Sequence, residues 1–330
     1  MTSVKFKKLL FDGDILCHKA GAVSEIRHHC VVWPDGESYL AFRYVAQAKE
    51  YIKDKPGYSV RMEQEALPLG FAIKCVEGLI NTACNELGCG EYEIYLSPTN
   101  SNTNFRHQLC SEYKANRKGL KKPINLNGIR KYLVEEHKAQ VMVKYEADDA
   151  LGIMQTHMDS KGETSCIVSI DKDLLQIPGY HYNPDNHELI KASDPGKIWL
   201  IQRKSGKKDL KGYGFLFFCA QLLLGDAIDN IFGLKGVGAV KAYNTLSKFN
   251  DGKYAFKDMM TEVIKLYRKH DRLQDLQKNS RLLWILRRPS QLTADHLTLL
   301  YHTLLPLTPT GDEEEEGCTS AKKDESTDKE

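Results

Sequence analysis

The sequence predicts an α/β fold, in which a mainly parallel sheet has helices on both faces and a helical subdomain follows it. Short β-branched and apolar segments alternate with segments of helical periodicity up to about residue 200, a pattern typical of a parallel sheet. Beyond residue 212 almost every segment has helical periodicity. The 330 residues, 42 % of them apolar, are sufficient for two domains with a substantial core.

The first half of the chain contains the strand signals. Residues 4–11, 92–96 and 165–170 predict strands, and residues 28–45 predict a hairpin around a Pro-Asp-Gly turn. Residues 68–87 and 146–158 carry apolar side chains at helical spacing and predict helices. The purely polar residues 97–104 predict a loop.

The second half begins with a basic loop and then predicts helices. Residues 195–212 include this loop, whose bases lie between 203 and 211, and the helices cover 213–224, 237–249, 254–269 and 271–288. We expect a division into residues 1–205, 206–308 and 309–330. The last of these is an acidic tail whose near lack of apolar side chains predicts disorder.

The charge of the chain is unevenly distributed. The formal net charge is +2, but residues 311–330 contain nine acids and three lysines, so the rest of the chain carries +8. Residues 105–131 alone hold eight bases and one acid. A basic body indicates a polyanionic partner, and an acidic tail indicates either competition for that basic surface or recruitment of another protein.

Several other classes of protein are excluded. The longest apolar run, 215–224, has about ten residues, whereas a membrane span needs roughly 20. The N-terminus reaches acidic residues before a signal peptide could form. Nine scattered cysteines without a CxxC pair predict neither a disulfide framework nor a zinc site. We therefore expect a soluble protein in a reducing cytoplasm.

Acidic residues follow the ends of the predicted strands. Asp12 ends one strand, and Asp171 and Asp173 end another, at the edge where ligands bind in open α/β sheets. Three more acids, Glu146, Asp148 and Asp149, begin a predicted helix, and Asp226 and Asp229 follow an apolar helix. Each alone has a structural explanation, since acids cap helices and favour the helix dipole.

Together these carboxylates favour a metal site. Acids that converge on one sheet edge repel one another strongly in a partly desolvated cleft. Mg²⁺ or Mn²⁺, which prefer oxygen ligands, would relieve that repulsion. Two such ions can clamp the attacking and leaving oxygens of a phosphodiester. Few histidines lie near these acids, which argues against zinc.

Two further elements are suited to phosphate. The segment Tyr113–Lys118 supplies lysine and arginine cations, and Tyr113 offers a ring that could stack on an unpaired base. The glycine-rich segment 233–242 offers close backbone approach to a phosphate at the start of a helix. No strand precedes it, so a dinucleotide-binding unit is not indicated.

At this point the sequence resembles the flap endonuclease and bacteriophage 5′–3′ exonuclease family. The matching motifs occur in the family order between residues 11 and 242: FDGD (11–14), YKANRK (113–118), YEADD (145–149), SIDKD (169–173), GDAIDN (225–230) and GLKGVG (233–238). The resemblance implies a PIN-like nuclease domain over residues 1–205 and a helix-three-turn-helix DNA-binding subdomain over 206–308.

The resemblance also implies roles for individual residues. One metal ion would be held by Asp12, Glu146 and Asp148, and the other by Asp173, Asp226 and Asp229, with Asp171 near both. Asp149 would either act through a water or support the ligands from behind without binding the metal. The catalytic side chains would be Lys114, Arg117 and Tyr113. DNA would be bound by Arg106, Lys118, Gly233, Lys235, Gly236, Gly238 and Lys241, with K⁺ as a further ion at the Gly233–Gly238 turn.

One departure from the family pattern concerns the strand before the basic segment. The family carries another acid there, whereas this chain reads Leu96-Ser97-Pro98-Thr99-Asn100-Ser101. Either a neutral oxygen or a water replaces it, or the first metal ion binds more weakly.

The implied function is a Mg²⁺-dependent 5′ nuclease, with Mn²⁺ as a substitute, that acts on duplex, nicked or 5′-flapped DNA in phage replication or recombination. Its place would be the host cytoplasm, RNA primers are candidate substrates, and the tail could recruit a replication protein. Two alternatives stay open. A DNA-binding accessory protein would keep the fold without catalysis, and a phosphatase of the haloacid dehalogenase type would use Asp12-Gly13-Asp14 but leave the basic segment unexplained.

Overall fold

The computed structural model describes residues 4–38 and 40–292, and the predicted acidic tail lies outside the described residues. A six-stranded sheet forms the centre of the molecule, with strand order β6-β5-β1-β7-β8-β9. Its strands are β1 (Lys8–Asp12), β5 (Tyr92–Leu96), β6 (Gln140–Val141), β7 (Ser165–Val168), β8 (Gly179–Asn183) and β9 (Glu188–Ala192). All neighbours are parallel except β9, which runs antiparallel to β8.

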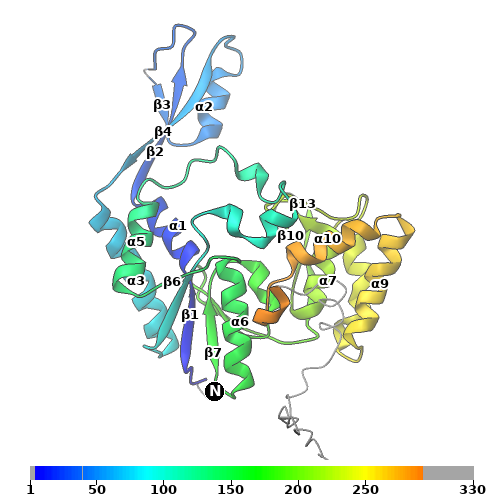
Figure 1. Ribbon diagram of the computed structural model, residues 1–330. Helices are drawn as coiled ribbons and strands as arrows, with labels where there is room; N and C mark the ends of the chain where they lie inside the picture. The colour runs from blue at the N-terminus through cyan, green and yellow to red at the C-terminus, as the bar shows by residue number, and fades with distance from the viewer. Residues whose placement is uncertain (1–3, 39, 293–330) are drawn as a thin grey trace, which may run out of the picture.

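Helices cover both faces of this sheet, as the sequence predicts (Figure 1). One face carries α1 (Gly13–Val23), α3 (Leu69–Leu87) and α5 (Leu126–Glu136), and the other carries α6 (Ala147–Ser160). Because successive strand residues point to opposite faces, Leu9 and Phe11 pack in the first cluster, and Leu10 packs in the α6 cluster. This is the mainly parallel α/β fold expected from the sequence.

The hairpin predicted for residues 28–45 is part of a larger unit that we call the arm. The arm consists of β2 (Glu25–Val32), β3 (Leu40–Phe42), α2 (Val45–Ile52) and β4 (Ser59–Ala66). Its three strands pair antiparallel in the order β3-β2-β4, and Figure 1 shows it projecting from the body beside α1. The sequence predicted neither β4 nor α2.

The segments between β5 and α6, and those after β7, carry most of the residues of interest. They include η1 (Ser101–Thr103), α4 (Phe105–Leu109), η2 (Ala115–Arg117) and η3 (Lys172–Gln176). The predicted basic loop 195–212 is instead an antiparallel hairpin of β10 (Lys197–Gln202) and β11 (Lys208–Tyr213). The predicted boundary between residues 205 and 206 would fall in the turn of this hairpin.

The remaining described residues are mainly helical. They form α7 (Gly214–Leu224), the short hairpin β12 (Gly225–Asp226) and β13 (Ile231–Phe232), α8 (Ala239–Leu246), η4 (Ser247–Asp251), α9 (Phe256–Lys269), α10 (Leu273–Leu283) and η5 (Pro289–Leu292). Helix α7 is apolar all round because it is buried: Phe215 and Phe218 pack against Trp284. Helix α10 ends at Leu283, five residues earlier than predicted.

The chain after α10 returns to the sheet. Ile285 is buried in the α6 cluster with Leu151 and Ile177, so residues from the end of the described chain complete the core of the first half. Among the described residues, no helix is long and apolar enough to cross a membrane. The eight described cysteines are all free thiols.

Candidate active site at the carboxyl edge of the sheet

Three of the predicted metal-binding acids lie together where β1 and β7 end. Asp12 is the last residue of β1 and caps α1, accepting hydrogen bonds from the backbone N–H of Asp14 and Ile15 at 3.1 Å. Ser169 links it to the next strand, since its hydroxyl donates to Asp12 at 2.8 Å and accepts from the Asp171 N–H at 3.0 Å. Asp148 reaches the same place from the first turn of α6.

The pKa values of Asp12 and Asp148 in this group are raised by burial and by the neighbouring acids. Burial, followed by repulsion from Asp14 and Asp171, raises the pKa of Asp12 to about 7. Burial, followed by repulsion from Asp12 and Asp171, raises the pKa of Asp148 well above its ordinary value. Proteins relieve such repulsion by binding a proton or a cation.

A second group of acids lies beside the basic segment. Glu146 accepts hydrogen bonds from Lys114 Nζ at 2.6 Å and from the Tyr113 hydroxyl at 2.9 Å. Asp229 contacts the same hydroxyl at 3.1 Å and pairs with Arg117 at 2.5 Å. Burial opposes ionisation of Glu146, but the charges of Lys114 and Arg106 outweigh it and lower its pKa to about 2.

The third group joins η3 to the end of α7. Lys172 Nζ lies 2.7 Å from Asp173 and 3.3 Å from Asp226, and the Gln221 amide donates to Asp173 at 2.6 Å. Burial and the neighbouring Asp171 raise the pKa of Asp173 to about 7. Asp171 therefore interacts with both the first and the third groups.

The structure thus brings seven of the eight predicted acids to one edge of the sheet. They are Asp12, Glu146, Asp148, Asp171, Asp173, Asp226 and Asp229. Their oxygens form a donor set suited to hard divalent cations. Burial, followed by repulsion from neighbouring acids, raises the pKa values of Asp12, Asp148 and Asp173, and a bound cation would oppose both effects. Within residues 4–38 and 40–292, no three Asp, Glu, His or Cys side chains are already arranged around one ion position.

The eighth acid, Asp149, does not join the other seven, so of its two expected roles only that of a support behind the ligands agrees with its contacts. It is fully buried and receives two hydrogen bonds from Arg106, at 2.5 and 2.8 Å, together with the N–H groups of Glu146 and Leu286. Successive residues of a helix point about 100° apart, so Asp148 faces the cluster whereas Asp149 faces the core. Asp149 is a structural residue and has no oxygen directed to a metal site.

Arg106, which was predicted to bind DNA, is likewise buried and paired inside the protein. Its side chain is 3 % exposed, and besides Asp149 it donates to the carbonyl oxygens of Leu282 and Trp284 at 2.9 and 2.7 Å. All of its donor groups are therefore engaged inside the protein, and the prediction that it binds DNA is wrong. Its role is to fasten α4 and α6 to the returning C-terminal segment.

Tyr113 also differs from the prediction. Only 2 % of it is exposed, and its ring packs edge-on against His107. A ring in this position cannot stack on a base. Its hydroxyl instead lies between Glu146 and Asp229, where it holds two acids that come from distant parts of the sequence.

The glycine-rich turn divides into buried and exposed positions. A Cβ at Gly233 would lie 2.3 Å from the Leu224 carbonyl carbon, so glycine is required there by backbone packing, and its presence is not evidence of phosphate binding. Leu234 and Val237 are buried and hold the turn. The other predicted DNA-binding positions, Lys118, Lys235, Gly236, Gly238 and Lys241, are exposed.

Several residues at this edge were not predicted. Lys172 and Ser169 contact the acids directly, and Ser97 occupies the strand end where the expected acid is missing. The Ser97 hydroxyl accepts from the Ala147 N–H at 2.9 Å, and its own N–H donates to Asp14 at 3.1 Å. Their place in the sequence could have indicated them, because Ser97 and Ser169 directly follow parallel strands and Lys172 lies between two of the acids.

Comparison with known proteins shows which family the chain resembles. Residues 35–193 match the family described as 5′–3′ exonuclease, N-terminal resolvase-like domain. This part of the chain is therefore similar to the 5′–3′ exonuclease family. The matched stretch contains β5 and β7, the two neighbours of β1 in the sheet, together with the basic segment and the acids from Glu146 to Asp173.

Individual relatives resemble part of the chain. A 5′–3′ exonuclease of Buchnera aphidicola subsp. Schizaphis graminum is 30 % identical over 190 residues, which cover 57 % of this chain and 62 % of that protein. The flap endonuclease Xni of Shewanella denitrificans is 31 % identical over 149 residues, which cover 44 % of this chain and 55 % of that protein. The match therefore spans little more than half of these relatives.

A solved structure is similar over a longer stretch. The bacteriophage T5 D15 flap endonuclease, crystallised with DNA and metal ions, is 14 % identical to this chain with a TM-score of 0.47. The alignment covers 90 % of this chain and 97 % of that chain. The family assignment depends on the sequence comparisons.

Proposed function

We propose that this protein is a Mg²⁺-dependent 5′ nuclease that hydrolyses phosphodiesters near the 5′ ends of duplex, nicked or 5′-flapped DNA. The observation that carries the proposal is the convergence of seven acids on one sheet edge next to Lys114 and Arg117, in a chain whose residues 35–193 match the 5′–3′ exonuclease family. A basic body of charge +8 is consistent with a polyanionic substrate.

The residues of this chain have separable tasks in the proposed reaction. Asp12, Glu146 and Asp148 would hold one cation, and Asp173, Asp226 and Asp229 the other, with Asp171 near both. The chemistry that such ions supply when bound is Lewis-acid activation of water and of the phosphate. Lys114 and Arg117 neutralise charge that develops on the phosphoryl oxygens, which is the electrostatic contribution expected of fixed cations in a partly buried site.

Hydrogen bonds to the loop after α7 position the basic segment that carries Lys114 and Arg117. Lys114 has a left-handed backbone conformation (φ 55°), and its N–H donates to the Asp229 carbonyl at 3.0 Å. The Asn116 amide donates to the Ala227 carbonyl at 2.8 Å. The basic segment is thereby attached to the loop that follows α7, so both halves of the chain build one site.

Hydrolysis of labelled DNA tests the proposal. We expect 5′ products from duplex, nicked and flapped DNA in Mg²⁺, and none in EDTA. Asp148→Asn should abolish activity, whereas Asp159→Asn, which changes an exposed acid on the same helix α6, should leave it unchanged. Activity that persists in EDTA, or in Asp148→Asn, would contradict the metal-dependent mechanism.

Finer features of the proposal concern substrate and setting. We propose that Mn²⁺ substitutes for Mg²⁺, that K⁺ binds at the Gly233–Gly238 turn, and that RNA primers are cleaved alongside DNA. The setting would be phage replication or recombination in the host cytoplasm, with the acidic tail as a contact for a replication protein. Comparing RNA-primed with all-DNA substrates in the same assay tests the primer activity.

A DNA-binding protein without catalysis is the second candidate. Ser97 at the strand end that lacks an acid, and the contacts of Lys114 and Lys172 with the acids, favour it. It predicts salt-dependent duplex binding with no hydrolysis at any Mg²⁺ or Mn²⁺ concentration. A single turnover experiment with excess protein distinguishes the two candidates.

A further inference from the structure

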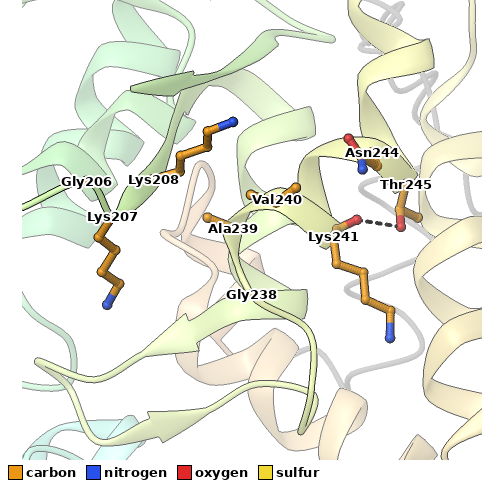
Figure 2. Close-up of a pocket in the computed structure, with 9 residues that line it drawn as sticks. All are labelled: Gly206, Lys207, Lys208, Gly238, Ala239, Val240, Lys241, Asn244 and Thr245. Carbon is orange, nitrogen blue, oxygen red and sulfur yellow. Dashed lines mark hydrogen bonds between the residues drawn. The ribbon is translucent and has the colours of Figure 1, made fainter. Parts of the chain in front are cut away.

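A groove of about 770 Å³ lies between the β10–β11 hairpin and the start of α8 (Figure 2). The hairpin turn contributes Gly206, Lys207 and Lys208, and the helix contributes Gly238, Ala239, Val240, Lys241, Asn244 and Thr245. In Figure 2 the side chains of Lys207 and Lys241 extend on either side of the turn at Gly238. The hairpin lysines belong to none of the sites considered above.

The groove is positively charged and contains no acid. Its lining has three lysines and no aspartate or glutamate. Among the ion pairs between described residues, none involves Lys207, Lys208 or Lys241. Arg203 of the same hairpin is already paired with Asp209, whereas the three lysines that line the groove have no ion pair with a described carboxylate.

The same chain carries a negatively charged segment of suitable composition. Asp312 to Glu316 are five consecutive acids within a tail of nine acids and three lysines. An extended peptide places one residue about every 3.4 Å, which is also about the spacing of charges along one DNA strand. The acidic run therefore resembles a short stretch of nucleic acid backbone in charge density.

The tail is long enough to reach the groove. Nineteen residues lie between Leu292, the last described residue, and Asp312. A fully extended chain of that length spans about 70 Å. A body of this size has a radius of gyration of about 19 Å, so the extended length exceeds the diameter of the molecule, which is about 50 Å.

We propose that the acidic run 312–316 binds in the groove formed by Lys207, Lys208 and Lys241 and competes there with the DNA backbone. Tail binding follows from the charges of this chain alone, whereas the competition rests on the proposed nuclease function. The consequence is a minimum affinity for ligands of the groove. Polyanions that bind only weakly do not displace the tail, whereas a duplex that also contacts the active site does.

The test uses full-length protein in EDTA, so that DNA is bound but not cleaved. The tail variant E313Q/E314Q/E315Q/E316Q should bind a labelled duplex roughly three- to tenfold more tightly than the wild type at 50 mM salt, because an intramolecular competitor is removed. The gain should disappear by 200 mM salt. Equal affinity of the variant and the wild type at low salt would overturn the proposal.

The groove variant K207E/K208E tests whether the gain in DNA affinity arises from tail binding in this groove. Adding the tail substitutions to it should give no further gain, because the tail has lost its binding site. The control K74E/K161E makes the same change in net charge at exposed lysines of α3 and of the end of α6, and there the gain should persist. A gain that survives undiminished in K207E/K208E would show that the tail acts elsewhere.

A measurement without DNA separates this proposal from the nuclease function. A fluorescent peptide of residues 309–330 should bind the tail variant in low salt and bind K207E/K208E/E313Q/E314Q/E315Q/E316Q at least tenfold more weakly. If the peptide binds the groove while no form of the protein binds DNA, the nuclease function fails and the tail proposal stands. If DNA binds and the peptide does not, the tail proposal fails alone.

Discussion

Replacing Asp149 by alanine separates its structural role from the metal-binding role predicted by sequence. Asp149 is fully buried and receives two hydrogen bonds from Arg106 and two from backbone N–H groups. Breaking a buried ion pair from one side costs about 3–5 kcal/mol, and each lost hydrogen bond to the backbone costs about 1 kcal/mol more. We therefore expect Asp149→Ala to lower the free energy of unfolding by about 5–7 kcal/mol.

Urea unfolding followed by circular dichroism in EDTA measures this loss. With a slope of about 3 kcal/mol/M, the midpoint should fall by about 2 M. The control Glu135→Ala removes an exposed partner of Lys131 at 3.7 Å and should cost less than about 1 kcal/mol. The double variant Arg106→Met/Asp149→Leu should regain the share of stability lost to the unpaired charge, because it leaves no unpaired charge in the core. The hydrogen bonds of both side chains to the backbone stay lost in that variant.

The reasoning would be refuted by a variant that keeps its stability and loses affinity for metal. Asp149→Ala with an unchanged midpoint and a weakened response to Mg²⁺ would make Asp149 a ligand after all. A large loss in Asp149→Ala that the double variant does not restore would mean that packing, and not charge, dominates at this position.

Three further predictions concern other parts of the molecule. Burial lowers the pKa of His181 to about 4, so as the pH falls the unfolded chain binds a proton before the folded chain does. The contribution of neutral His181 to the free energy of unfolding is therefore complete above about pH 6.5, and about 3 kcal/mol of it is lost by pH 4. Urea unfolding at pH 7 and pH 4.5 should show this loss in the wild type and not in His181→Gln. Gly233→Ala should cost about 1–3 kcal/mol because its Cβ meets the Leu224 backbone, whereas Gly238→Ala, with open space around the Cβ, should change the melting temperature little; equal losses would contradict the packing explanation. Under the proposed function, Lys114→Met should lower kcat about 100-fold, while Lys118→Met, an exposed neighbour, should mainly weaken DNA binding; a normal kcat in Lys114→Met would remove that residue from the mechanism.

The sequence was sufficient for the sheet edge because parallel strands end on the same side. Asp12 and Asp171 could be expected to meet without coordinates, since each follows a strand of the same sheet. The helix-start acids required more information. Asp148 and Asp149 are identical in type and adjacent, and only the packing of α6 decides which of them faces solvent and which faces Arg106.

Burial explains the other differences between prediction and structure. Tyr113 and Arg106 lie in a segment whose composition indicates a solvated basic surface, yet both turn inward to acids supplied by α6 and the loop after α7. The arm was only partly predicted because β4 alternates exposed and half-buried residues and carries three charged side chains. Such a strand is recognised by its pairing with β2, which the local sequence does not contain.

The return of the chain after α10 has a consequence for how the protein is made. Ile285 fills the core beside α6, and the carbonyl groups of Leu282 and Trp284 complete the shell of Arg106. During synthesis the N-terminal half therefore leaves the ribosome before the residues that close its interior exist. Until about residue 287 has emerged, the apolar surface beside α6 stays exposed to solvent. We expect the N-terminal half to become stable only when this short segment has docked against it.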